Sequence, residues 1–208
     1  MRAFAAAAGV HLGALLTGRT RIERATKPVL MPLLAEYVLL RGGPRPLALA
    51  LLFGCAGDTL LQAGGDMPFL LGMGAFAAGH LCYLAQFAKH GRPSRRLTAV
   101  YGTAWAGTLA LLWPGLDAEL RVPVALYSLL LTTMALGATR AGVRPAAGGA
   151  LFLLSDTLIA AGLTGRPQPQ FWIMLTYVTA QYLLAEGLLR PEGARGTARP
   201  AKAGPQPK

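Results

Sequence analysis

The sequence predicts an all-α polytopic membrane protein with about eight transmembrane helices, and two observations support this fold class. First, 53% of the 208 residues are hydrophobic and only 14% are charged, whereas soluble domains carry about 25% charged residues. Second, the apolar residues are gathered in runs, and most bases fall between these runs or in the last twenty residues. This composition excludes an ordinary soluble enzyme. It also excludes an intrinsically disordered chain, because so much apolar surface must be buried.

Eight apolar runs can be assigned as helices, and most approach the roughly 20 residues that a helix needs to cross a bilayer. They span residues 3–17, 28–40, 46–63, 68–88, 97–114, 122–139, 146–164 and 170–189. No A-x-A cleavage site follows the alanine-rich first run, so we expect a retained helix rather than a secretory signal. We expect one transmembrane domain over residues 1–190 and a disordered basic cytoplasmic tail over residues 191–208.

The net charge of +11 is better explained by membrane topology than by nucleic-acid binding, because excess Lys and Arg in short loops orients a membrane protein. With both termini in the cytoplasm, 14 of the 20 bases fall in cytoplasmic segments. The segment 18–27 does not fit this distribution, since its four bases would lie on the outer side of the membrane. Either the first helix is not an ordinary span, or some of these bases serve the outer mouth of a site. The composition is typical of a high-GC bacterium, and we expect the plasma membrane with a cytoplasmic C-terminus.

Two segments suggest an internal repeat. Residues 58–64 read Asp-Thr-Leu-Leu-Gln-Ala-Gly, residues 156–162 read Asp-Thr-Leu-Ile-Ala-Ala-Gly, and five of the seven positions are identical. The segments are 98 residues and four helices apart, so both helices run in the same direction through the membrane. This arrangement predicts two parallel four-helix halves. Chance similarity between helices rich in Leu, Ala and Gly is the alternative explanation.

Four of the nine acids fall inside the expected spans. An acid in the hydrocarbon costs about 2.5–3.5 kcal/mol on insertion scales and is therefore a functional candidate by default. Glu36 and Glu186 lie near the cytoplasmic ends of their helices. We expect structural roles for them, with Glu186 in an ion pair on the helix surface with Arg190, four residues along.

Asp58 and Asp156 differ from these two glutamates, because no base neighbours either of them in sequence. Each lies some 10–12 residues into its helix, which is roughly 15–18 Å from the cytoplasmic end. Both carboxyls are therefore expected at similar depth, near the midplane or somewhat outward. Such a pair can supply one protonated acid and one ionised base for acid-assisted hydrolysis. The competing interpretations are a proton or cation relay in a transporter and a purely structural role.

Further polar residues are expected at the depth of the two acids. Phe76, His80 and Tyr83 share one face of the fourth helix by their i, i+4, i+7 spacing. Tyr177 and Gln181 have i, i+4 spacing on the eighth helix. With Tyr127 on the sixth helix and Ser155 on the seventh, these side chains predict a pocket rather than scattered interhelical hydrogen bonds.

The sequence gives little support to a metal or cofactor site. His80 alone of the three histidines lies at useful depth, so a three-His zinc site cannot be assembled, although an Asp-Asp-His site is conceivable. Cys55 and Cys82 lie inside apolar runs and are expected to pack as small apolar side chains. The chain has no P-loop, no GxSxG and no GxGxxG after a strand. We therefore expect no metal and no cofactor.

Several short motifs together resemble the YhhN family. Their order and spacing over about residues 26–189 give the resemblance its specificity. The motifs are Thr26-Lys27-Pro28, Gly57-Asp58 with Leu61, Phe76 with His80 and Tyr83, Tyr127 with Met134, Gly149-Ala150 to Ser155-Asp156, and Thr176-Tyr177 with Gln181.

This resemblance implies an eight-helix integral membrane protein and a reaction. Animal members of the family are lysoplasmalogenases, which hydrolyse the vinyl ether bond of lysoplasmalogens to a fatty aldehyde and a glycerophospho-alcohol. The resemblance implies Asp58 and Asp156 as the catalytic pair, one as general acid and the other orienting the water. The expected partners are a lysophospholipid substrate and membrane lipid, and the bacterial substrate is open between a lysoplasmalogen and another ether or ester lysolipid.

A set of substrate-binding residues accompanies the catalytic pair. The set comprises Lys27, as a phosphate contact, and His80, Tyr83, Tyr127, Ser155, Tyr177 and Gln181. Two other functions stay open. One is a small proton-coupled transporter or lipid scramblase that uses the Asp pair, and the other is a non-catalytic membrane scaffold. A transporter needs a pathway open to both faces, whereas an enzyme can have a closed end.

Overall fold

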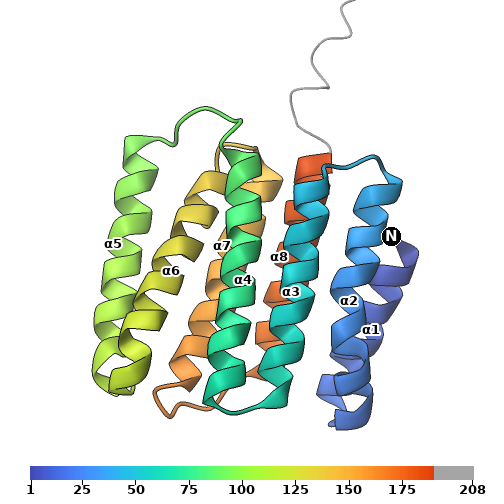
Figure 1. Ribbon diagram of the computed structural model, residues 1–208, viewed down its shortest axis with the longest axis horizontal. Coiled ribbons are helices and arrows are strands. Elements are labelled where there is room, and N and C mark those ends of the chain that lie inside the picture. Colours follow the sequence, from blue (N-terminus) through green and yellow to red (C-terminus); the bar gives the residue numbers. More distant parts are fainter. Residues whose placement is uncertain (190–208) are drawn as a thin grey trace, which may run out of the picture.

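The computed structural model describes residues 1–189, which form eight α-helices and one 3-10 turn (Figure 1). The prediction of an all-α fold with eight helices is confirmed, while the expected tail at 191–208 lies outside the described residues. The elements are α1 (Arg2–Leu16), α2 (Thr20–Leu40), α3 (Arg45–Ala63), α4 (Asp66–Phe87), α5 (Arg95–Leu112), η1 (Trp113–Gly115), α6 (Ala118–Ala138), α7 (Val143–Gly162) and α8 (Gln170–Leu189).

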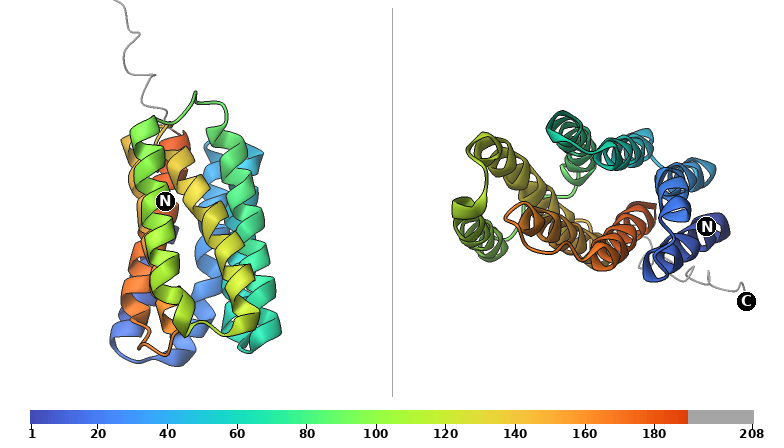
Figure 2. Two further views of the ribbon diagram at one scale, coloured as in Figure 1. Left: turned by 90° about the vertical axis from the view of Figure 1, so that its left-hand side faces the viewer. Right: turned by 90° about the horizontal axis from the view of Figure 1, so that it is seen from below.

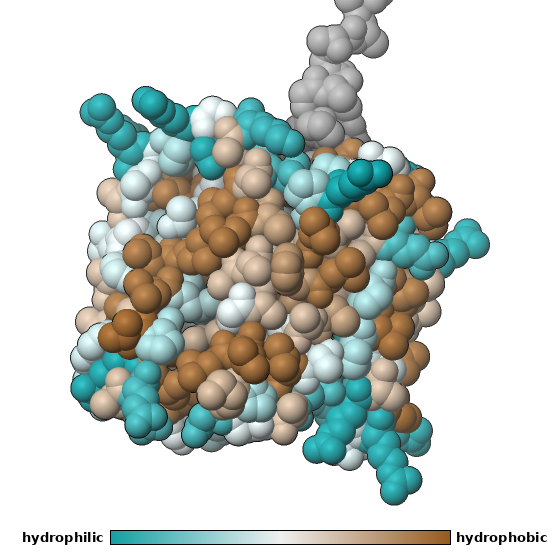
Figure 3. Space-filling model, viewed as in Figure 1, coloured by the Kyte–Doolittle hydropathy of each residue, from teal (hydrophilic) through white to brown (hydrophobic). Residues whose placement is uncertain are grey.

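The helices run alternately up and down, and their loops gather at the two ends of the bundle (Figure 1). Hydrophobic side chains occupy the middle of the face in Figure 3, and hydrophilic side chains gather at its upper and lower rims. Four helices, α3, α4, α6 and α7, are long and apolar enough to cross a membrane. A helix satisfies its own backbone hydrogen bonds, as a spanning segment must. The chain is an integral membrane protein.

The helices form an elongated ring when the bundle is seen along its axis (Figure 2). The hairpins α3–α4 and α7–α8 are the most closely packed pairs, α2 packs on α3, and α6 packs on α7. Contacts of α4 with α6 and of α2 with α8 close the ring, and α5 lies outside it against α6. The α2–α3 and α3–α4 contacts have counterparts in the α6–α7 and α7–α8 contacts, and the contact of α4 with α6 has a counterpart in that of α8 with α2. A 4+4 repeat requires this correspondence.

Helix α2 begins at Thr20, eight residues before the expected start at residue 28. The proline at position 28 suggested a first helical residue, but Pro28 and Pro32 both lie inside the helix. A proline in a helix has no N–H for the carbonyl four residues earlier. The Cys55 thiol of α3 donates instead to the Pro28 carbonyl, with 3.1 Å from Sγ to O, and replaces the bond that Pro32 lacks. The basic segment 18–27 is therefore largely helical.

Glycines bring α7 into close contact with α8. A Cβ added at Gly148 would lie 2.9 Å from the Ala180 carbonyl oxygen and 3.0 Å from the Leu184 backbone nitrogen. Neither backbone atom can move without moving α8. Small residues at helix interfaces permit such approach in membranes, where packing rather than hydrophobic burial drives helix association.

We expect Gly148→Ala to destabilise the bundle by about 1–3 kcal/mol, because the added methyl overpacks the α7–α8 interface. Gly102→Ala on α5 is the matched control, since a Cβ there meets nothing within 4 Å. The measurement is the melting temperature in detergent. A Gly148→Ala variant as stable as the control would contradict the close contact.

Candidate functional site

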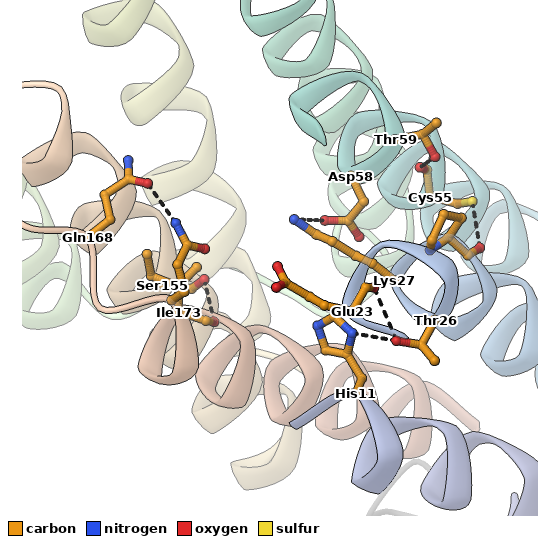
Figure 4. Close-up of polar contacts among 12 residues, drawn as sticks. His11, Glu23, Thr26, Lys27, Cys55, Asp58, Thr59, Ser155, Gln168 and Ile173 are labelled. Atoms are coloured by element: carbon orange, nitrogen blue, oxygen red, sulfur yellow. Dashed lines mark hydrogen bonds and ion pairs between the residues drawn. The ribbon is translucent and has the colours of Figure 1, made fainter. Parts of the chain in front are cut away.

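Asp58 of α3 is buried, with 3% of its surface exposed, and its charge is met by a base from another helix. The Lys27 Nζ of α2 lies 3.6 Å from the Asp58 Oδ1, and the two side chains point toward one another in Figure 4. Lys27 turns inward, whereas Arg19, Arg21 and Arg24 are exposed. The inward placement of Lys27 favours the explanation that some bases of the segment 18–27 serve a site, rather than the one in which the first helix is not an ordinary span.

The second carboxylate oxygen of Asp58 and the hydroxyl of Tyr177, on α8, are both buried. They lie close enough to interact with one another, and Gln181 of α8 also lies within reach of the Tyr177 hydroxyl. Asp58 is therefore surrounded by polar groups from α2 and α8.

Asp156 of α7 is held by a chain of hydrogen bonds that crosses three helices. The Tyr127 hydroxyl of α6 donates to the Asp156 Oδ2, and the Tyr127 oxygen lies 3.2 Å from the His80 Nε2 of α4. Since the Tyr127 proton goes to Asp156, His80 must donate from Nε2, and its Nδ1 is then an acceptor. That Nδ1 is buried without a partner in the described part of the chain.

The two acids are close enough for the charge of one to act on the other. They differ in their surroundings, because Asp58 faces the Lys27 ammonium while Asp156 faces the neutral Tyr127 hydroxyl. Asp156 is half-buried, since it lines a cavity described below. The pair expected at one depth is therefore brought together, with a cation beside Asp58.

Aromatic rings pack together beside the acids in the centre of the bundle. Phe152 of α7 packs edge-on against Tyr177, with ring centroids 5.5 Å apart, and against His80 at 4.9 Å. Phe76 of α4 lies edge-on to Tyr177 at 6.0 Å. A Cβ added at Gly57 would approach the Phe76 ring to 2.5 Å, so the glycine before Asp58 makes room for this ring.

Three other residues predicted to bind substrate lie in the same core. The Tyr83 hydroxyl donates to the Gln181 Oε1 at 2.6 Å, joining α4 to α8. The Ser155 hydroxyl donates to the Ile173 carbonyl at 3.0 Å (Figure 4), so its proton is already engaged. All three side chains are buried, and their part in binding stays a prediction.

The expectation that Glu186 lies on the helix surface was wrong, whereas nothing in the described residues tests its expected ion pair with Arg190. The structure buries this side chain, with 4% exposed, and the Tyr37 hydroxyl of α2 donates to its Oε1 at 2.5 Å. The physical reason is that α2 and α8 pack against one another and cover this face of α8. Arg190 lies outside the described residues, while Glu36 is exposed.

Sequence reasoning gave no role to His11, which the structure buries completely. Its Nδ1 lies 2.8 Å from the Thr26 Oγ1, next to Lys27, and its Nε2 has no partner among residues 1–189 (Figure 4). A single histidine in an alanine-rich helix was the only signal available. Its contact with the Thr26-Lys27 motif depends on how α1 folds back on α2.

An apolar cavity borders Asp156, and neither Lys27 nor Asp58 is among its lining residues. It lies among α4, α5, α6 and α7 and encloses about 900 Å³ free of protein atoms, part of it open to the outside. The Asp156 carboxyl and the Tyr127 hydroxyl are polar groups in its wall. Within residues 1–189, no group of three or more His, Cys, Asp or Glu side chains could hold a metal ion.

Comparisons with known proteins agree with the resemblance seen in the motifs. The sequence model of the YhhN family matches residues 22–188. A Mycobacterium bovis protein named lysoplasmalogenase is 33% identical over 191 residues, covering 84% of this chain and 73% of the relative. The pig protein lysoplasmalogenase TMEM86B is 35% identical over 163 residues, with 74% and 71% covered. No solved structure matches the chain.

We expect Lys27→Met to lower the free energy of unfolding by about 3–5 kcal/mol, because it leaves Asp58 charged and unpaired in a buried site. The double variant Lys27→Met/Asp58→Asn removes both charges and should recover most of this loss. Arg24→Met, at an exposed base on the same helix, is the control. Melting in detergent provides the measurement, and a double variant no more stable than Lys27→Met would rule out the pairing.

Proposed function

The chain belongs to the YhhN family, and we propose from this membership that it is a membrane-embedded hydrolase of the vinyl ether bond of lysoplasmalogens. The products are a fatty aldehyde and a glycerophospho-alcohol. Relatives named lysoplasmalogenase cover most of the chain at 33–35% identity. The observation that carries the proposal is the pair of interacting carboxyls inside the bundle, of which Asp58 faces a cation and Asp156 faces the Tyr127 hydroxyl.

The reaction suits two carboxyls with different surroundings. A proton adds to the outer alkene carbon of the vinyl ether, and an oxocarbenium ion forms. Water adds to this cation and loses a proton, and the hemiacetal then collapses to the aldehyde and the alcohol. The proton given up at the start is replaced by the one that water loses, so the enzyme returns to its initial state.

We assign the proton donor to Asp156. Two interacting carboxyls beside a single ammonium are best balanced when one of them carries a proton, and Lys27 stabilises the charge of Asp58. Asp156 also lines the apolar cavity, where an alkenyl group would be desolvated. The ionised Asp58 then orients the water and offsets the positive charge of the oxocarbenium ion.

Tyr127 and His80 act as positioning residues for Asp156. Tyr127 donates to one carboxyl oxygen, which leaves the other oxygen to carry the proton toward the substrate. His80 fixes Tyr127 from the far side. A general acid works when its proton lies within hydrogen-bond reach of the reacting atom, and this chain of contacts holds the carboxyl in one orientation.

The polar end of the substrate is assigned to the side of Lys27. An ammonium has three donors, and the ion pair with Asp58 leaves donors for a phosphate oxygen. The Tyr177 hydroxyl lies beside Asp58 and is a candidate contact for a glycerol hydroxyl or the attacking water. The pair formed by Tyr83 and Gln181 and the buried Ser155 shape the wall of this space.

A proton-coupled transporter or lipid scramblase is the second candidate function. The matching pairings of helices in the two halves favour it, since repeats of this kind are common in transporters. The Asp pair would then carry protons rather than donate them to an alkene. For either function, we propose a bacterial plasma membrane with a cytoplasmic C-terminus, from the distribution of bases.

We expect Asp58→Asn and Asp156→Asn each to lower the rate of aldehyde release by about 10²–10⁴-fold, because a positioned acid or base contributes that much. Purified protein in vesicles receives alkenyl-lysophosphatidylethanolamine, and mass spectrometry follows the aldehyde. Glu36→Gln, at an exposed acid, is the matched control, and the acyl lysolipid is the control substrate.

Full hydrolysis by either Asn variant would overturn the assignment of the pair. A well-folded wild-type protein that releases nothing from either lipid would overturn the hydrolase. Proton-coupled lipid flux across the same vesicles would then be measured.

We expect Tyr127→Phe to lower kcat by about tenfold or more with little change in KM, because the Asp156 carboxyl loses its fixed orientation while the substrate contacts stay. Tyr101→Phe, on α5 and away from the acids, should leave both constants unchanged. Steady-state kinetics of the two variants check this. A rise in KM with kcat intact would instead give Tyr127 a role in binding alone.

A further inference from the structure

Helix α5 is attached to the bundle unlike its neighbours. Of its 18 residues, only Leu112 at its last turn is buried. It packs mainly on α6, lies at the end of the molecule opposite α1, and has only marginal contact with α7 (Figures 1 and 2). A helix with so little buried surface is retained for reasons other than filling the core.

The inward face of α5 forms a wall of the apolar cavity. Ala104, Trp105, Thr108, Leu109 and Leu112 all line it, a spacing that keeps one face of the helix toward the cavity. The opposite walls come from α4, α6 and α7. The space of about 900 Å³ free of protein atoms includes a part open to the outside, so the cavity is a cleft behind α5 rather than an enclosed chamber.

A hydrogen bond joins α5 to α6 across this space. The Trp105 indole Nε1 donates to the Ser128 Oγ at 3.0 Å, and both residues line the cavity. The Thr132 hydroxyl, also in the wall, is buried without a partner among residues 1–189. The cavity is thus closed on its outer side by a lightly held helix rather than by core packing.

The cavity extends along the bundle axis on both sides of the proposed acid, with Leu131 and Leu153 toward one end and Ala160 and Leu163 toward the other. Asp156 and Tyr127 lie in its wall at one level. Leu112 ends α5 and Leu163 follows α7, so the cavity reaches the end of the bundle near these residues. Seven residues separate Asp156 from Leu163, which is about 10 Å along a helix.

We propose that this cavity binds the single aliphatic chain of the lysophospholipid, with α5 as the wall between chain and bilayer. The inference rests on the proposed function. The two vinyl ether carbons are the first two carbons of the alkenyl chain. A chain whose vinyl ether lies at Asp156 must therefore continue from that residue, and the apolar cavity extends from there toward Leu112 and Leu163, while the phosphate extends toward Lys27.

Ala160→Phe tests the proposal, because Ala160 lines the cavity one turn beyond Asp156 and a phenyl ring there would fill it. We expect kcat/KM for octadecenyl-lysophosphatidylethanolamine to fall about tenfold or more, while the value for a butenyl substrate, whose chain is too short to pass Ala160, stays within about twofold. Ala104→Phe should cause the same shift from the α5 wall. Ala99→Phe, exposed on α5 and outside the cavity lining, is the matched control.

A second measurement does not depend on hydrolysis. A saturated 1-O-hexadecyl lysophosphatidylethanolamine with a diazirine at the chain end is photolysed with the protein, and labelled peptides are identified. We expect label on cavity residues such as Met73, Leu109 and Leu112, competition by unlabelled hexadecyl lysolipid, and loss of label in Ala160→Phe.

The outcomes separate the two proposals. Label in the cavity from a protein that hydrolyses no alkenyl lipid would leave the cavity as a chain site and remove the hydrolase. Hydrolysis with an unchanged chain-length profile in both Phe variants would remove the inference and keep the hydrolase. Label spread over outward-facing residues of all helices, unaffected by Ala160→Phe, would also overturn the inference, because it would report bilayer contact alone.

Discussion

Two carboxyls inside a membrane-spanning bundle are the constraint on which the rest of the structure depends. A charge in this medium must be paired or hydrogen-bonded, and neither acid finds a partner on its own helix. Asp58 takes Lys27 from α2, and Asp156 takes Tyr127 from α6, which in turn meets His80 from α4. The helices are therefore held in an order that brings these side chains together, and aromatic rings pack beside them.

The two halves of the chain supply acids at equivalent positions, but the two acids have different hydrogen-bond and charge partners. Asp58 and Asp156 occupy the same place in a repeated seven-residue segment, and the helices around them pair in the same order. One carboxyl nevertheless meets a cation and the other a neutral hydroxyl. Two acids at equivalent positions of the repeat therefore have different surroundings. This difference allows one carboxyl to donate a proton while the other stays ionised.

The sequence predicted the features that depend on the local pattern of apolar residues and on the free-energy cost of placing a charge in the membrane. Apolar runs located all eight helices, and the cost of an intramembrane acid singled out Asp58 and Asp156. What failed were properties that depend on contacts between distant segments. Pro28 indicated a helix start, but the thiol of Cys55 on α3 makes a proline tolerable in mid-helix. Glu186 is buried because α2 covers it, and His11 reaches Thr26 only through the fold of α1.

Asp156 stands between an apolar cavity and a polar ion pair, and this position bears on how the proposed reaction ends. Cleavage there divides an amphiphile into two molecules with opposite solubilities. The aldehyde partitions into the bilayer, and the phosphate-bearing alcohol partitions into water. Each product leaves for a phase that the other avoids, so the two rarely meet again at the site. Separation of the products between two phases would make the cleavage effectively one-way without any input of energy from a nucleotide or an ion gradient.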